Sequence, residues 1–403
     1  MPGKKPRTFN RLHFVLFEWK KNANRLFWLI LLGLIVADVI KISSEFTLDA
    51  TTKQAQNMKA DKEYQAFVSE ISGEITKERI DRIIAGRQRH IQQMELQVVT
   101  DQEGRNCSRI YDYYRYCYEY DRQSYALAQK AKENVVFYQD HGDDRKAQEN
   151  RLAYSVYSGR KNILFSPQNG YDWLFRYDFS TLLILILATY LSFGFFFREK
   201  NEDTYQILLT SGSRKMIFFG KLLVLGCLLL IGCLALSLTD HLVVGRSMNL
   251  SWPTAKLYSE QAYQYCVPDL SILAYDAVLF AFRYLHAFLM MLTAAFLSNL
   301  FEGRILPVLS SLSVPLLSVF VLEYYFKPDS WFRTFQIRWI GNRLLLEYQW
   351  ILILDFLLLL LLPLACFLTF APVSPVRTAF RLLKRVGNVF SGRRKGGSAY
   401  DKG

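Results

Sequence analysis

The apolar residues of this chain are gathered into long runs that are separated by strongly charged stretches. A helix rises about 1.5 Å per residue, so roughly 20 apolar residues cross a hydrocarbon core of about 30 Å. Six runs approach or exceed that length and carry almost no charge, which excludes one large soluble fold and predicts six transmembrane helices. The runs are residues 26–43, 180–197, 216–239, 277–300, 305–322 and 350–371.

The positive charge of the chain lies beside these runs. The formal net charge is +13, and residues 1–25, 198–221, 302–304 and 373–403 together hold 21 basic and six acidic residues. Basic loops stay in the cytoplasm, so the pattern places these four segments, and both termini, on the cytoplasmic side. The basic charge therefore indicates a membrane surface as the counter-charge, and no nucleic-acid partner is expected.

Residues 44–175 then face the opposite side of the membrane, and they are numerous enough for a small domain. Apolar residues between Val68 and Met94 recur at spacings of three, four and seven, which predicts a long amphipathic helix or a helical hairpin. We therefore expect an all-α polytopic membrane protein, with six transmembrane helices and an inserted, mainly helical extracytoplasmic domain.

Residues 105–125 are rich in tyrosine and contain two cysteines. Each tyrosine offers a rigid apolar face with a polar tip, so the stretch is suited either to packing against the other outer helices or to binding a partner. The two cysteines are Cys107 and Cys117, and Cys266 follows the third run. Outside the cytoplasm such thiols tend to oxidise, although the sequence does not say which pair forms.

The sequence carries no recognisable catalytic or metal-binding pattern. It has no GxxxxGK[ST] phosphate loop and no HExxH motif, so we expect neither an enzyme nor a bound cofactor or metal in this chain. The five histidines are not at metal-ligand spacing; they are His13, His90, His141, His241 and His286.

Ionisable residues inside or near the ends of the apolar runs are candidates for an ion relay, because burying them in lipid is costly. They are Asp38, Asp276, Arg283, His286 and Asp355. Arg283 and Asp276 are seven residues apart, which places them near one helix face, with His286 one turn further on. Most of them lie close to a predicted outer boundary, where solvation at a helix end explains them without a function.

Residues 199–212, between the second and third runs, read as a short helix. Glu199, Glu202 and Asp203 stand at its start and Arg214 and Lys215 follow it, which matches the helix dipole. Tyr205, Leu208 and Leu209 fall on one face. An amphipathic helix of this kind packs either on lipid headgroups or on a partner.

This segment resembles the signature of the type-2 ABC exporter permease family. The matching residues are Arg198, Glu199, Glu202, Thr204, Leu208, Leu209, Ser211, Arg214, Gly220 and Lys221. The chain departs from the family at Asp203, where glycine is usual, and in the long insertion after the first run. Residues 9–25 resemble the interfacial elbow helix of these permeases, and residues 323–349 resemble their short outer helices before the last span.

The resemblance implies a permease subunit without its own ATPase activity. In that family residues 199–212 would form the coupling helix, with Glu199, Glu202, Thr204, Tyr205, Leu208, Leu209 and Arg214 contacting the ATPase. The implied partners are two copies of an ABC ATPase, which would bind ATP and Mg, and a second permease in a homodimer or heterodimer. The implied location is a bacterial cytoplasmic membrane, and the cargo, whether peptide, lipid or small molecule, stays open.

The predicted layout has four parts: residues 1–43 with an amphipathic helix and the first span, 44–175 as the outer domain, 176–373 with spans two to six, and 374–403 as a basic cytoplasmic tail. A second hypothesis treats the chain as a membrane-anchored sensor or assembly factor. In that case residues 44–175 would bind a partner and the spans would only transmit a signal.

The cysteines give the first testable prediction. Cys107 and Cys117 are close enough in sequence for a small loop of modest entropy cost, but a helix would separate their Cα atoms by about 15 Å, so pairing needs a bend between them. The alternative is that one of them pairs with Cys266. A non-reducing peptide map of protein from an oxidising compartment should show one of these bridges; free thiols at all three positions would contradict both.

Overall fold

The computed structural model describes the first half of the transmembrane region and parts of the insertion. The described residues are 11–48, 73–74, 76, 78, 81–86, 88, 126–160, 164–165, 170–177, 179–195, 197, 199, 214–248, 250, 252–260, 263, 269–301, 305–316, 361 and 364.

Four helical stretches within this described part are long and apolar enough to cross a membrane: Arg25–Phe46, Gly170–Ser192, Arg214–Ser247 and Ile272–Leu300. They correspond to the first four predicted runs, and they are built from α2 (Arg25–Leu48), α8 (Gly170–Arg176) with α9 (Phe179–Ser192), α12 (Arg214–Ser247) and α13 (Ile272–Leu300). The chain therefore has the character of a membrane protein, and the helices are mostly longer than the runs that predicted them.

The last two predicted spans are only partly covered by the described residues. Helix α14 (Ile305–Leu316) begins where the fifth run begins, and it has 12 residues, too few to cross a bilayer alone. The rest of that run lies outside the described residues, as do the sixth run except for residues 361 and 364, Asp355 and residues 323–349. The count of six spans stays a prediction.

The second run ends earlier than predicted. Helix α9 stops at Ser192 rather than at residue 197, and the chain turns: Gly194 N–H donates to Leu191 O at 2.9 Å and Phe195 N–H donates to Ser192 O at 3.1 Å. Bonds to the third preceding carbonyl tighten the last turn of a helix. The apolar composition of the phenylalanine-rich end concealed this turn, because periodicity and hydropathy do not report local hydrogen bonding.

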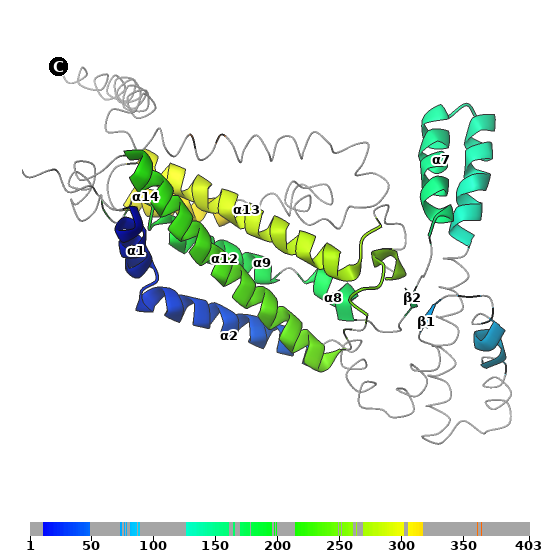
Figure 1. The fold of residues 1–403 in the computed structure, drawn as a ribbon, viewed down its shortest axis with the longest axis horizontal. Coiled ribbons are helices and arrows are strands. Elements are labelled where there is room, and N and C mark those ends of the chain that lie inside the picture. Colours follow the sequence, from blue (N-terminus) through cyan, green and yellow to red (C-terminus); the bar gives the residue numbers. More distant parts are fainter. Residues whose placement is uncertain are drawn as a thin grey trace, which may run out of the picture.

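Helices α2, α9, α12 and α13 pack around one apolar core (Figure 1). On α2 the buried residues recur every three or four positions, from Phe27 through Leu31, Leu34 and Asp38 to Ile42. Large apolar side chains on the other face are exposed, among them Leu29 and Ile40, which are 64% and 63% exposed. A helix that is apolar on both faces, with one face packed and one uncovered, is what a lipid-facing bundle requires.

Helix α1 (Arg11–Asn22) precedes this bundle and lies beside the start of α12 (Figure 1). Phe14, Glu18 and Asn22 are buried against the bundle. Leu12, Leu16 and Phe17 are exposed. The segment before the first span is therefore helical, as the sequence predicts. Its exposed apolar face suits a membrane surface.

The described part of the insertion is mainly helical. Residues 126–140 form a helix that packs against α7 (Asp144–Ser158) through Leu127, Ala131, Ala153 and Tyr157. The turn between them uses Gly142 at φ +70°, a backbone conformation that favours glycine. The two helices form the hairpin drawn far from α1 in Figure 1.

A short antiparallel strand pair breaks the apolar pattern predicted for residues 68–94. Strand β1 (Gly73–Glu74) pairs with β2 (Leu164–Phe165), which excludes the predicted single helix through residue 73, while the alternative of a helical hairpin stays a prediction. Gly73 is a poor helix former, and the β-branched Ile75 and Thr76 follow it, so a local strand competes well. Residues 81–86 are helical, with Ile83 buried.

Gly220 lies where α12 passes close to α1. A Cβ atom built there would lie 2.8 Å from Phe14 Cε1, whereas one at Gly33 on α2 would meet nothing within 4 Å. We predict that Gly220→Ala lowers the free energy of unfolding by about 1–3 kcal/mol through overpacking. Gly33→Ala should be neutral or stabilising by up to about 1 kcal/mol. Both variants gain the same helix propensity, but only the alanine at position 220 meets a neighbouring side chain.

Denaturation of the full-length chain in detergent measures both variants. Equal stabilities of Gly220→Ala and Gly33→Ala would show that α1 does not dock on α12 in the way described.

Candidate functional site

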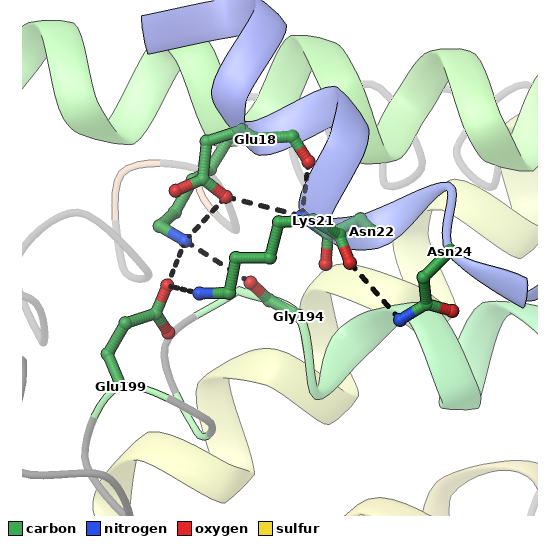
Figure 2. Close-up of polar contacts among 7 residues, drawn as sticks. Glu18, Lys21, Asn22, Asn24, Gly194 and Glu199 are labelled. Carbon is green, nitrogen blue, oxygen red and sulfur yellow. Dashed lines mark hydrogen bonds and ion pairs between the residues drawn. The ribbon is translucent and has the colours of Figure 1, made fainter. Parts of the chain in front are cut away.

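The strongest concentration of buried charge lies where α1, α12 and the segment after α9 meet. Glu18 and Lys21 come from α1, Glu199 follows the turn that ends α9, and Lys221 lies in the second turn of α12. We call these four residues the lysine cluster. Figure 2 shows Glu18 and Lys21 of α1 together with Glu199, which comes from the segment after α9.

Lys221 is the centre of the lysine cluster. Its Nζ donates to Glu18 Oε2 at 2.9 Å and to the Gly194 carbonyl at 3.4 Å, and it also pairs with Glu199 Oε1. Lys21 Nζ reaches the same Glu199 oxygen at 2.6 Å. The side chain of Lys221 is fully buried and those of Glu18 and Glu199 nearly so, while Lys21 is 21% exposed.

Two ammonium groups and two carboxylates make the lysine cluster neutral. Taking one charge out of water costs several kcal/mol unless opposite charges and hydrogen bonds compensate for it. Burial pushes the pKa of Glu199 upward, but attraction to Lys221 and Lys21 outweighs it, so the pKa lies below its ordinary value of 4.5. Glu199 therefore stabilises the fold fully above pH 4.5, and this contribution is lost as the pH falls through the lowered pKa.

Local hydrogen bonds hold the α1 side of the lysine cluster in place. Asn22 Nδ2 donates to the Glu18 carbonyl at 2.9 Å and to Glu18 Oε2 at 3.2 Å, which fixes the carboxylate that Lys221 needs. Asn24 Oδ1 accepts from Phe27 N–H at 3.0 Å and caps the start of α2. The bend between α1 and α2 thus places the lysine cluster beside the first turns of α12.

A second group of buried charges lies near the opposite end of the bundle. Tyr177 Oη donates to Asp38 Oδ1 at 2.8 Å, and Arg283 Nη1 lies 3.9 Å from Asp240 Oδ2. Arg283 Nη2 also donates to the Tyr177 carbonyl at 3.0 Å. We call Asp38 on α2 and Asp240 on α12 the aspartate pair, because their carboxyl groups lie within hydrogen-bonding reach of each other.

The structure separates the ionisable residues that sequence spacing grouped together. Asp276 pairs with His241, whose Nε2 lies 3.0 Å from Asp276 Oδ2, whereas Arg283 faces Asp240. His286 is buried within α13. No group of three or more His, Cys, Asp or Glu residues suited to a metal occurs within the described part of the chain.

The predicted ATPase-contacting residues are mostly outside the described residues. This applies to Glu202, Thr204, Tyr205, Leu208 and Leu209, and likewise to the cysteines at 107, 117 and 266. Arg214 is exposed at the start of α12. Glu199 is described, and its carboxylate is buried and bound to lysines of its own chain, which leaves its predicted contact with an ATPase untested.

Sequence reasoning missed three members of these clusters, which are Glu18, Lys21 and Asp240. Glu18 is the one acidic residue among residues 1–25, and Asn22 follows it by one helical turn, a spacing that would have indicated a structural role. Asp240 was placed just beyond the third span, but α12 continues to Ser247 and carries it into the bundle.

A comparison of the chain with protein-family models, with curated proteins and with solved structures finds no match.

The lysine cluster makes a quantitative prediction. Lys221→Met should lower the free energy of unfolding by about 3–5 kcal/mol, because it leaves two carboxylates buried without their central cation. Lys41→Met is the matched control: Lys41 forms an exposed pair with Glu45 at 3.0 Å, and its loss should cost under about 1 kcal/mol. Denaturant titration of both variants in micelles compares them, and similar small losses would remove Lys221 from the stabilising contacts.

Proposed function

We propose that this chain is the membrane subunit of an ATP-binding-cassette exporter. In this role it pairs with a second permease and two separate ATPase subunits in a bacterial cytoplasmic membrane, with both termini in the cytoplasm. ATP would be hydrolysed by the partners, and the spans would form the path for the cargo. Four long apolar helices and the amphipathic helix α1 are compatible with this role.

The contact between Glu199 and Lys221 is the observation that supports the proposal most. These two residues belong to the two ends of the stretch that resembles the family signature, and their ion pair joins those ends. The described residues on either side of 200–213 therefore meet at one buried cluster. A partner that moves this stretch would act directly on α1 and α12.

The same contact refines which residues would meet an ATPase. Glu199 is engaged inside the lysine cluster, so we assign it to anchoring the stretch. The contact itself then falls to Glu202, Thr204, Tyr205, Leu208, Leu209 and Arg214. Closure of the ATPases on ATP would push on these residues, and the lysine cluster would transmit the displacement to the spans.

Purification of the full-length chain from its native membrane tests the proposal. An ATPase should co-purify with the wild type, and its affinity should fall roughly 30-fold, or about 2 kcal/mol, in Glu202→Lys and in the double variant Leu208→Ala, Leu209→Ala. These changes leave the spans intact, so insertion into the membrane should be unaffected.

Leu152→Ala is the matched control, since Leu152 is an exposed leucine of α7, on the hairpin of the insertion. It should keep the ATPase at the wild-type level. If no ATPase accompanies the wild-type chain, or if the purified chain alone hydrolyses ATP, the exporter proposal is wrong and the sensor hypothesis gains.

A further inference from the structure

The aspartate pair is a buried site whose charges do not balance. Asp38 is 0% exposed and Asp240 is 1% exposed, and they sit on facing helices, α2 and α12. Among the described residues, Arg283 of α13 is the cation that faces them, so two carboxylates share one guanidinium there. With both carboxylates ionised, this group would carry a net charge of −1 inside the bundle.

The hydrogen bonds around the aspartate pair are also incomplete. Asp38 Oδ2 and Asp240 Oδ1 are buried and accept no well-formed hydrogen bond from a described residue, and Ser180 Oγ, in a residue that is 1% exposed, lies near Asp240 without completing one. A carboxylate only accepts hydrogen bonds, whereas a carboxylic acid also donates one. Two ionised carboxylates in contact therefore leave buried oxygens unsatisfied, at a cost of several kcal/mol.

Binding of one proton would remove both the excess negative charge and the lack of a hydrogen-bond donor. If it binds to either carboxyl group, the net charge falls to zero, and the new O–H donates to the facing carboxylate or to Ser180. Paired carboxylates at short distance share a proton for this reason, because both cannot ionise together. We propose that Asp38 and Asp240 form a proton-binding site that holds one exchangeable proton between α2 and α12.

Several polar and ionisable side chains surround the aspartate pair. Tyr177 donates to Asp38, and Ser180 lies beside Asp240. The other ionisable groups near the site are His241 with its partner Asp276, Arg283 from α13, and Glu45, which acts on Tyr177. His241 and Asp276 are 27% and 24% exposed, so, unlike the aspartate pair, they are not enclosed within the bundle.

This inference does not depend on the exporter proposal. It concerns α2, α9, α12 and α13 and would hold for a sensor with the same bundle. A site that gains and loses one proton between two helices would let the transmembrane pH difference act on their packing. An exporter and a sensor would both be sensitive to it.

Infrared spectroscopy of the full-length chain in lipid nanodiscs tests the site. A protonated carboxylic acid has a C=O stretch separate from that of a carboxylate, and it shifts in heavy water. At neutral pH, where exposed carboxyl groups are ionised, the wild type should show one such acid, unchanged when sodium and potassium are removed. Labelling the aspartate side-chain carboxyl carbons with ¹³C should shift this band.

Variants assign the band to the pair. Asp38→Asn and Asp240→Asn should each abolish it, because an amide supplies the missing donor and leaves one carboxylate for Arg283. Asp276→Asn, the control, should retain it. If only one of the two Asn variants folds, that variant is sufficient to assign the band, because labelling of the wild type shows independently that the band comes from an aspartate.

Three results would overturn the proposal: no acid band in the wild type at neutral pH, a band that aspartate labelling does not shift, or a band that appears only after sodium and potassium are removed. The last result would identify the occupant as a metal cation in place of a proton.

Discussion

A fully buried ammonium group is the constraint on which the part of the bundle next to α1 depends. Lys221 cannot be placed inside α12 unless carboxylates come to it, and they come from α1 and from the chain after α9. The helix before the first span, the turn at Gly194 and the close approach at Gly220 are all arranged around this one requirement. The packing of three segments is thus tied to one charge.

Hydropathy predicted the first four long helices, because an apolar run of that length has few alternatives. It did not predict where α9 ends or that a strand interrupts residues 68–94, since both depend on hydrogen bonds between particular groups. The charged clusters were the hardest to foresee. Glu18 and Lys221 are 203 residues apart, and no local pattern connects them.

The two charged clusters follow the same physical rule with different outcomes. In the lysine cluster, two cations meet two carboxylates, and the group is neutral as built. In the aspartate pair, one guanidinium serves two carboxylates. Sequence reasoning identified Asp38 and Arg283 as ionisable residues in or near apolar runs, but the balance of charge in each cluster depends on partners that no local pattern reveals.

Helix α12 belongs to both clusters, and its length gives this a mechanical meaning. Lys221 and Asp240 are 19 residues apart on one continuous helix, which corresponds to about 28 Å along the axis and about 100° around it. The helix is therefore held by charged contacts near each end, and these contacts lie on different sides of its axis. Rotation of α12 about its long axis would therefore displace both clusters together, so a change at one end of this helix would be felt at the other.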